Sequence, residues 1–497
     1  MTREELENEV RQLKTIVNQL STQMQFMTGA PPATTAVPGG AVLPNIAPGA
    51  TAPSNIPSRA TAVGPSATGG VGAPGQSLPP NPPPTNRFNS PATLESKKGN
   101  FRFGPGFELR TDDDENILQF HNLTQLEYRG YQQGGQTNVR DTFDIPRQWF
   151  MFSGRMGKPF GYYVSMANGF DTFTALDVFL DVEYDPRIRL RFGRFKSPFT
   201  YEFLVEPVQG LVIPERSIFF NNFGQNRDLG VMAYGRLFNN KFDYAGGIFN
   251  GVRNSFVDLQ NSKKVSALLN YRPFGDNEGA LLENLNVGGS VYAGESQQVP
   301  IPQTLRTVVP TSGNSVAGIP FLGFNNNVRE SGFQAFWDLH VAWFYKQWEF
   351  IGEWGSGNQD YALSSAYQYR YRVPIQSFYL QSSYLLTGET RSSIGIVKPL
   401  RPFDLRKGQF GTGALEPFFR FEFLDVGSQV FTDGLADKNQ WANRVYQTWV
   451  GMNWHMTQYM KVYCGWNHAE FNQPVIYAPG HSQRTSDLFM LRFQLYF

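Results

Sequence analysis

The sequence has 497 residues, and its 43 Lys and Arg against 42 Asp and Glu leave a net charge of +1. This balance provides no global basic field, so nucleic acid is not an expected partner. Only 41% of the residues are hydrophobic, yet 15% are aromatic. Many aromatic residues at low mean hydropathy are typical of strands that alternate between lipid and water.

No run of 18 or more apolar residues occurs, which excludes a transmembrane helix. A chain that crosses a membrane without such helices must form a closed barrel, because lipid cannot satisfy an open sheet edge. The single cysteine, Cys464, excludes an internal disulfide. Residues 1–9 are polar and acidic and contain no signal peptide, so we expect the numbering to begin after that signal or to omit it.

Residues 2–27 carry apolar residues spaced alternately by four and three. These residues are Leu6, Val10, Leu13, Val17, Leu20, Met24 and Met27. The spacing is a heptad seam and predicts a short α-helical coiled coil, with a single amphipathic helix as the alternative. A helix this short is marginal alone, so self-association within an oligomer would stabilise it. Residues 28–99 are rich in Pro, Gly, Ala, Thr and Ser, which predicts a disordered linker.

Residues 100–497 change to a period of two. In 176–184, Leu176, Val178, Leu180, Val182 and Tyr184 alternate with polar residues, and the last segment, 489–497, repeats the pattern. A soluble sandwich shows similar alternation. Its persistence over this length favours an all-β transmembrane barrel, and roughly 25 residues per strand with its connection give about 16 antiparallel strands.

Short and long connections punctuate the predicted strands. The short ones, 239–240, 346–347 and 455–458, are expected to be periplasmic turns, whereas 300–327 and 426–443 are expected to be extracellular loops. An even number of strands places both ends of the barrel in the periplasm, where the coiled coil would also lie.

An arginine row is the first candidate for the pore lining. Arg187, Arg189 and Arg191 alternate with apolar residues, so we expect them to face the lumen and offer contacts to anions. If the preceding hairpin has a three-residue loop, Glu183 lies opposite Arg187 and Asp181 opposite Arg189. Those two arginines would then be neutralised, and Arg191 would remain available.

Several segments together resemble the phosphate-selective porin O and P family. They are 191–202 (RFGRFKSPFTYE), 214–217 (PERS), 226–230 (NRDLG), 247–251 (GIFNG), 378–389 (FYLQSSYLLTGE) and the terminal Phe497. The resemblance covers about residues 100–497. It implies an outer-membrane porin of 16 strands, a homotrimer, with a constriction loop folded into the pore. The residue after Glu202 is Phe203, where the resemblance implies lysine in phosphate-selective members, so phosphate specificity is not favoured.

Arg194 and Lys196 change parity after Gly193, which predicts that the strand ends or bulges there. With the resemblance, they would begin the inward loop. We expect the constriction to contain Lys196, Glu202, Glu206, Glu215 and Arg216, with Arg194 nearby. Opposed charges there favour polar solutes, and loop-to-wall ion pairs are the alternative role.

Further charged residues give weaker indications. Arg370 with Arg372, and Arg420 with Glu422, alternate with apolar residues and are expected in the lumen. The acidic run 112–115 is expected to be a solvated turn, because no ligand spacing supports Ca²⁺. The five scattered histidines give no metal motif, so we expect no metal, no cofactor and no enzymatic activity.

The sequence therefore predicts a water-filled pore in the bacterial outer membrane, in contact with its lipid. It would allow passive diffusion of small polar solutes or ions, with a leaning toward anions. The alternative function is a structural tether, in which the coiled coil and linker contact the cell wall or another periplasmic partner.

Overall fold

The chain is described by a computed structural model. The structure describes residues 99–497 except 105, 133–140, 170–171, 259, 309–317, 365–367 and 479. The predicted coiled coil (2–27) and the predicted linker (28–99), apart from Gly99, lie outside the described residues. Gly99 is the first residue of a strand.

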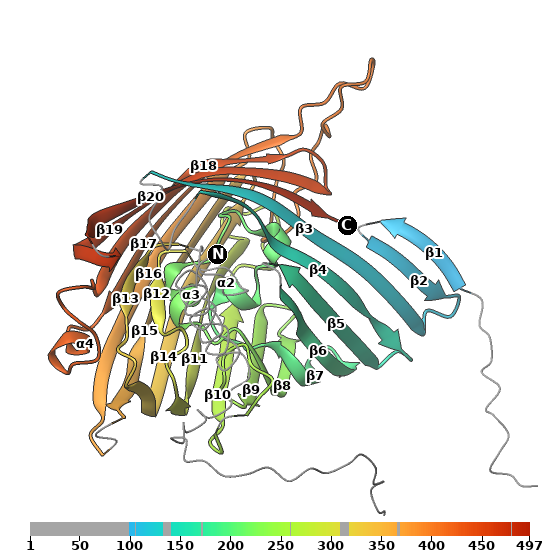
Figure 1. Ribbon diagram of the computed structural model, residues 1–497. Helices are drawn as coiled ribbons and strands as arrows, with labels where there is room; N and C mark the ends of the chain where they lie inside the picture. Colours follow the sequence, from blue (N-terminus) through green and yellow to red (C-terminus); the bar gives the residue numbers. More distant parts are fainter. Residues whose placement is uncertain are drawn as a thin grey trace, which may run out of the picture. The chain divides into compact units, whose positions relative to one another are not determined.

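Long antiparallel strands dominate the described residues (Figure 1). They are β1 (Gly99–Gly104), β2 (Gly106–Thr111), β3 (Asn116–Tyr131), β4 (Thr142–Met156), β5 (Phe160–Gly169), β6 (Thr172–Asp185), β7 (Ile188–Lys196), β8 (Arg227–Leu237), β9 (Phe242–Phe249), β10 (Lys264–Tyr271), β11 (Asn284–Gln298), β14 (Val328–Tyr345), β15 (Trp348–Leu363), β16 (Tyr371–Tyr384), β17 (Ala414–Val426), β18 (Arg444–His455), β19 (Met460–Ala478) and β20 (His481–Tyr496).

The sheet closes on itself through β3 and β20. Their register runs from Leu488 opposite Tyr131 to Tyr496 opposite Leu123. The sheet has 18 strands, and without the N-terminal pair β1 and β2 a closed ring of 16 remains. The predicted antiparallel barrel is therefore confirmed.

The period of two produces two chemically different faces, as β14 illustrates. Its Trp337, Leu339 and Val341 are exposed on the outer wall, whereas Asp338 and His340 are buried toward the lumen. Successive side chains of a strand point to opposite sides, so apolar residues at alternate positions give a lipid-facing band. No helix among the described residues is long and apolar enough to cross a bilayer.

Strand β6 follows the predicted alternation except at its start. Val178, Leu180 and Tyr184 are exposed on the outer wall as expected. Leu176, by contrast, is buried in an apolar cluster, because the register against β5 shifts between Ala175 and Asp177. Such a bulge inserts one unpaired residue and turns its side chain away from the regular pattern.

The connections separate into two ends of the barrel. The predicted short turns at 239–240, 346–347 and 455–458 join β8 to β9, β14 to β15 and β18 to β19. The predicted long loops at 300–327 and 426–443 lie at the opposite end, between β11 and β14 and between β17 and β18. The positions of these connections are as the sequence predicted.

One long connection at the short-turn end was not anticipated. Residues 385–413 join β16 to β17, and Ile394 of this connection packs in a buried cluster with Tyr201 and Ile351. Arg391 forms ion pairs with the buried carboxylates of Glu349 and Glu416. The segment therefore closes part of the lumen from that end.

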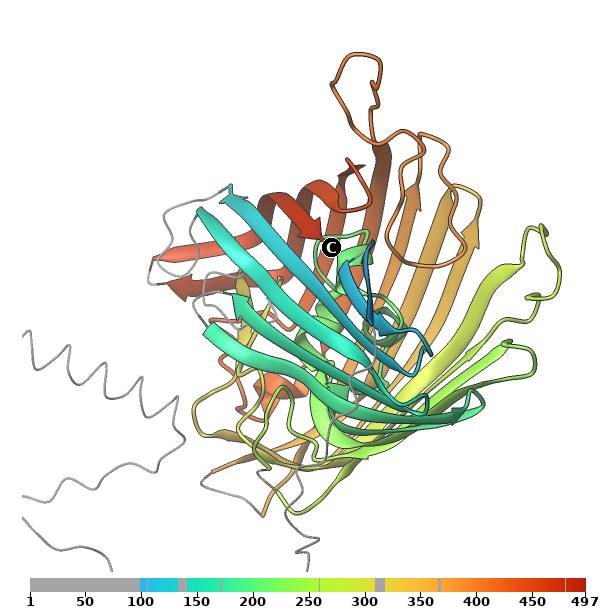
Figure 2. The ribbon, with the colours of Figure 1, turned by 90° about the vertical axis from the view of Figure 1, so that its right-hand side faces the viewer.

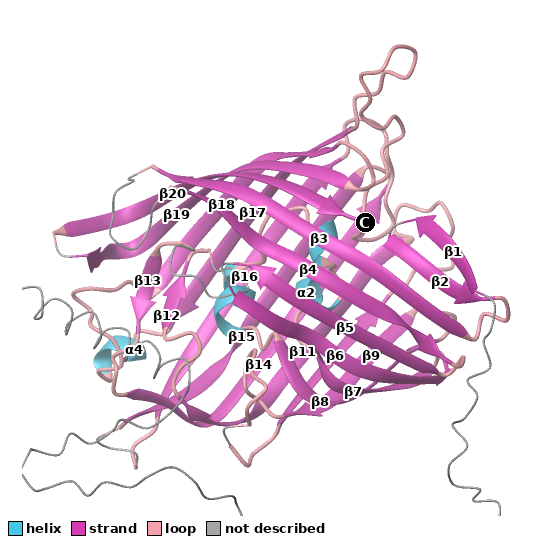
Figure 3. Cartoon of the chain, turned by 45° about the vertical axis from the view of Figure 1, so that its right-hand side comes forward, coloured by secondary structure: helices cyan, strands magenta, loops and turns pink. Residues whose placement is uncertain are grey.

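Loops also fill the lumen from the other end. The connection between β7 and β8, here called the inward loop (residues 197–226), contains α2 (Tyr201–Leu204), a 3-10 turn (Val208–Gly210) and α3 (Ile218–Phe223). Figure 3 shows its helical turns among the strands. The long loops contribute β12 (Thr304–Arg306), β13 (Pro320–Gly323) and α4 (Gln429–Thr432), which pack with α3 in a large apolar cluster.

Candidate permeation site

A cavity of about 360 Å³ lies between the inward loop and the wall formed by β3 to β8. Four cationic side chains line it, Arg191, Lys196, Arg216 and Arg227, together with the carboxylate of Asp177. Aromatic side chains fill much of the remaining wall. These are Trp149, Tyr163, Phe179, Phe195, Phe203 and Tyr496.

Two of the four cations are paired with carboxylates. Arg191 makes two parallel bonds to Asp181, both of 2.8 Å. The Nε of Arg227 lies 3.0 Å from both carboxylate oxygens of Asp177. Close pairs of this kind cancel much of the field that either charge would present to a solute.

The other two cations bond to backbone carbonyls instead. Lys196 Nζ donates to the carbonyl oxygen of Phe203 at 2.8 Å. Arg216 donates through Nη2 to the carbonyl of Glu206 at 2.9 Å and through Nη1 to that of Glu202. No carboxylate of the described residues lies within 4 Å of either cation. Neither side chain therefore has a direct carboxylate partner among the described residues.

The hairpin between β6 and β7 is tighter than a three-residue loop. Asp185 pairs with Ile188, and Asp181 lies opposite Arg191. The expected pairings are therefore wrong. Asp181 lies opposite Arg191 instead of Arg189, two residues further along β7, and Arg187 pairs with Asp185 instead of Glu183.

The shifted register changes the environment of each arginine in the row. Arg187 is on the exposed turn and pairs with Asp185. Arg189 lies 4.0 Å from Glu183. Arg191, which we expected to be unpaired, is paired with Asp181, although it does line the cavity.

Strand β7 neither ends nor shifts its register at Gly193, where we predicted an end or a bulge. Its pairing with β6 continues to Arg194, and its pairing with β8 continues to Lys196. Gly193 adopts a φ of +131°, and a Cβ there would approach the carbonyl oxygen of Val178 to 2.2 Å. Glycine is needed because the backbone turns here while it remains in the sheet.

Arg194 does not line the cavity. Its Nη1 donates to the carbonyl of Ala175, and its guanidinium lies 4.2 Å from the ring centroid of Phe256. The loop between β9 and β10 thus covers this arginine at the end of the strand.

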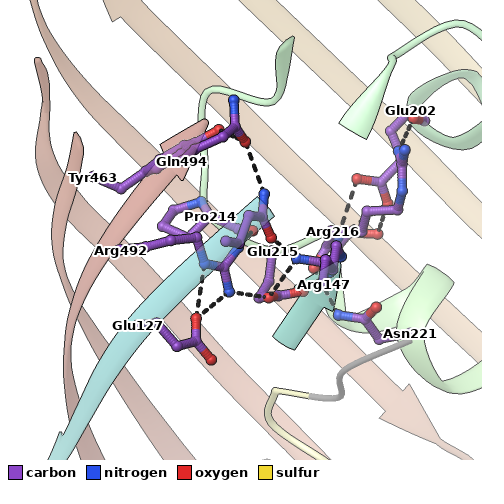
Figure 4. A network of polar contacts seen from close by, with 12 residues as sticks. Glu127, Arg147, Glu202, Pro214, Glu215, Arg216, Asn221, Tyr463, Arg492 and Gln494 are labelled. Atoms are coloured by element: carbon purple, nitrogen blue, oxygen red, sulfur yellow. Dashed lines mark hydrogen bonds and ion pairs between the residues drawn. The ribbon is translucent and has the colours of Figure 1, made fainter. Parts of the chain in front are cut away.

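Glu215 connects the inward loop to the barrel wall (Figure 4). It accepts bonds from Arg147 at 3.3 and 2.8 Å and forms a second ion pair with Arg492. Arg492 also pairs with Glu127, and all these side chains are almost completely buried. Buried charges persist in low dielectric only when paired and hydrogen-bonded. Glu215 therefore clamps the loop to β4 and β20.

The environment shifts the pKa of two carboxyl groups on the inward loop, which itself does not cross the membrane. Burial alone would raise the pKa of Glu215, but the charges of Arg147 and Arg492 outweigh it and lower the pKa to about 2. Burial, together with the neighbouring charge of Glu202, raises the pKa of Glu206, whose carboxylate oxygens accept no hydrogen bond within the described residues.

Glu202 and two wall carboxylates fix the helical turns of the inward loop. Glu202 accepts the backbone N–H of Ser217 at 3.0 Å. Glu353 of β15 accepts the N–H groups of Tyr201 and Glu202 at 2.9 and 2.8 Å, and Glu422 of β17 accepts that of Ile218 at 2.6 Å. Each carboxylate satisfies a donor that a helix start leaves unpaired.

More wall residues bond to the backbone of the inward loop. They are Ser266, Ser290, Arg420, Asn453, Lys461, Tyr463 and Gln494. Because these residues belong to β10, β11 and β17 to β20, the loop is bonded around much of the lumen.

The predicted lumen positions of Arg420 and Glu422 are confirmed, since both are buried against the inward loop. The prediction for Arg370 and Arg372 is wrong. On β16 the odd positions, such as Val373, face inward, and Arg372 is exposed and bonds to Asp360 of β15. At the end of a strand the outer face extends beyond the lipid band, so polar residues there do not indicate the lumen.

Residues 112–115 form the turn between β2 and β3, where Asp114 pairs with Arg110 and the Oγ1 of Thr111 bonds to Asp113. Within the described part of the chain, no group of three or more His, Cys, Asp or Glu residues is arranged to hold a metal ion.

Sequence reasoning missed the wall partners of the inward loop. Arg147, Arg492 and Glu127 occupy alternate inward positions on their strands, but contacts across the lumen have no local signal. Arg227 falls within a family-like motif, and Asp177 within a recognised strand, yet only the fold brings the two together.

Comparison with known proteins gives one family and a set of distant structures. The model of the family "Phosphate-selective porin O and P" matches residues 121–497. No curated protein gives a significant match.

Similar solved structures include the channel DcaP of Acinetobacter baumannii, with 9% identity, a TM-score of 0.46 and coverage of 78% of this chain and 99% of that chain. OmpF of Salmonella typhi in complex with daunomycin has 10% identity, a TM-score of 0.48 and coverage of 80% and 100%. OmpT of Vibrio cholerae in its trimer form has 7% identity, a TM-score of 0.45 and coverage of 77% and 100%. On the family match, this chain belongs to the phosphate-selective porin O and P family of outer-membrane channels.

Proposed function

We propose that the protein is a passive, water-filled pore for small polar solutes and ions, and that it favours anions. The observation that carries the proposal is the pair Lys196 and Arg216, two cations in the cavity without a carboxylate within 4 Å among the described residues. A pore selects by the charges that it offers a solute as water is stripped away. Since Arg191 and Arg227 are balanced by aspartates, Lys196 and Arg216 dominate the local field.

Phe203 supports this arrangement. Lys196 Nζ lies 5.0 Å and Arg216 Cζ 5.2 Å from the centroid of its ring, which stacks on Phe220 at 4.3 Å. An aromatic face attracts cations and holds them without cancelling their charge. Phe203 therefore positions both groups, in place of a lysine that would add a third charge.

The proposal is tested by reversal potentials in planar bilayers under a KCl gradient. Replacing Lys196 and Arg216 by glutamine should lower the chloride-to-potassium permeability ratio. Two unit charges at 4 Å in water interact by about 1 kcal/mol, which corresponds to about a fivefold change in the ratio.

Arg187→Gln is the matched control, because this arginine is on the exposed turn and should leave the ratio unchanged. An unchanged ratio in the double variant would refute the anion preference. A wild-type protein that gives no conductance would refute the pore itself.

We also propose a homotrimer. The outer wall of β3 to β5 carries a hollow of about 780 Å³ lined in part by Gln148. Beside it, three polar side chains bond to one another at 2.7 to 3.0 Å on the otherwise apolar outer face: Asn122, Thr124 and Gln148. Polar groups on this face favour a protein neighbour over hydrocarbon. Light scattering in detergent should give a trimer, and a monomer under conditions that retain conductance would contradict this assignment.

We assign the short-turn end of the barrel, and with it the N-terminal segment, to the periplasm. Single cysteines in a Cys464→Ser background test the assignment on intact cells. A membrane-impermeant maleimide should label Asn326→Cys at the long-loop end and leave Asn240→Cys unlabelled. The reverse pattern would invert the orientation.

A further inference from the structure

The β1–β2 hairpin extends the barrel wall beyond the closed ring. Strand β20 ends opposite Leu123 of β3, which leaves the first residues of β3 without a neighbour on that side. β2 takes this place, with Phe107 opposite Phe120 and Arg110 opposite Ile117. Figure 1 shows the hairpin in blue beside the start of β3, near the C-terminal end, and Figure 2 shows it from a second side.

The outward face of the hairpin is apolar and exposed. Phe101 pairs with Leu109 and Phe103 with Phe107, so the four side chains share one face. Their exposed fractions are 61, 49, 60 and 37%, respectively. A contiguous apolar patch of this kind on a small element marks a surface that another phase or molecule covers.

This face is continuous with the lipid-facing wall. Leu109 lies opposite Leu118, and Phe107 opposite Phe120, both of which point outward on β3. The ring of Phe107 lies 6.2 Å from that of Phe120 and 5.8 Å from that of Phe497. The hairpin therefore adds aromatic rings to one end of the outer wall, the level at which barrels place their aromatic girdle.

The opposite face of the hairpin is polar and joins the inner face of the wall. Glu108 accepts a bond from Gln119 at 2.7 Å and from Arg110 at 2.9 Å. Arg102, opposite Glu108, is on the same face. The two faces thus differ as the two faces of a barrel strand do, although the hairpin encloses no lumen.

We propose that the hairpin is a membrane-interface anchor, with Phe101, Phe103, Phe107 and Leu109 set into the lipid at the short-turn rim of the barrel. A phospholipid surface is the occupant, because the patch continues a face that lipid already covers and has the composition of an interfacial belt.

Spin labels on the full-length protein in phospholipid vesicles test this proposal. In a Cys464→Ser background, a nitroxide is attached at Phe103→Cys or at Arg102→Cys, and collisions with oxygen and with a water-soluble nickel chelate are measured. Native Cys464, exposed on the outer wall, provides the lipid-facing reference. The oxygen-to-nickel ratio at residue 103 should match that reference, and at residue 102 it should be lower by about fivefold, since the nickel complex is excluded from hydrocarbon.

Equal nickel access at the two sites would place the patch in water and overturn the proposal. Low collision rates with both oxygen and the nickel chelate, together with spin–spin broadening, would also overturn the proposal, because a second copy of the chain would then cover the patch. Phe101→Cys serves as a replacement if the variant at 103 does not fold, and conductance verifies folding in each case.

Discussion

Glu215 shows how one side chain can hold a long loop in place. Its carboxylate bonds to Arg147 of β4 and Arg492 of β20, and Arg129 lies 3.8 Å away. Removing one partner from a buried charge cluster typically costs about 3–5 kcal/mol, because the remaining charges lose their compensation. The arginines left behind would repel one another inside the barrel.

Glu215→Gln should therefore loosen the inward loop. We expect larger open-channel current noise and faster protease cleavage within residues 197–226, because two buried guanidinium groups lose a shared anion. Glu183→Gln is the control, since this exposed carboxylate lies 4.0 Å from Arg189. Equal noise in the two variants would show that Glu215 does not hold the loop.

The same carboxylate predicts an acid response. Its pKa is lowered from the model-compound value of 4.5 to about 2, so its contribution to the stability of the loop is complete above pH 4.5. The contribution is lost as the pH falls from 4.5 toward 2. Current noise in the wild type should rise over that window, while Glu215→Gln should lack this component. A rise confined to neutral pH would implicate a different group.

The strand that carries Lys196 depends on Gly193. Replacing Gly193 by alanine forces a side chain into a positive φ and against the carbonyl of Val178, at a cost of about 1–3 kcal/mol or more. We expect a lower yield of folded barrel in detergent, measured by the β-sheet circular dichroism signal and its urea midpoint.

Gly246→Ala in β9 is the matched control for that variant. A Cβ at Gly246 meets Ala267 at 3.7 Å, an ordinary contact, and its φ is not positive. Similar midpoints for the two variants would mean that the turn at Gly193 is not under constraint.

Elements of this barrel were predictable where the signal is local. Alternation along 176–184 and the positions of the turns follow from side-chain geometry and turn chemistry. The bulge at Leu176, the outward Arg372 and the extra hairpin were not, because each depends on what the neighbouring strand does. A two-residue hairpin in place of a three-residue one, together with a register shift between Val182 and Asp185, moved Asp181 from Arg189 to Arg191.

Across the whole molecule, the number of strands followed from length, whereas the packing of the lumen did not. Each strand encodes its lipid face, but it does not encode which loop crosses the interior. The nine candidate residues illustrate this difference. The structure places Arg191, Lys196 and Arg216 at the cavity, Glu202, Glu206 and Glu215 in the packed inward loop, and Arg187, Arg189 and Arg194 outside the cavity lining.

The alternative function, a structural tether formed by the residues before the barrel, concerns the whole chain. Deleting residues 1–98 should leave single-channel conductance unchanged, because the described barrel closes without them. If those residues reach the cell wall, the deletion should abolish co-sedimentation with peptidoglycan. Deleting residues 28–98 alone retains the heptad segment but removes the linker. This variant shows whether the heptad segment binds peptidoglycan only when the linker gives it enough length. Unchanged co-sedimentation after the full deletion would refute tethering.

Most bonds of the inward loop to the wall go to β10, β11, β15 and β17 to β20, whereas the cavity lies against β3 to β8. If the protein is a pore, we therefore expect a solute to pass off-centre, along the arc formed by β3 to β8. The two arcs should therefore evolve under different demands. Charges on the first arc are restrained by the fit of the loop, whereas charges on the second can change with the solutes that the cell needs.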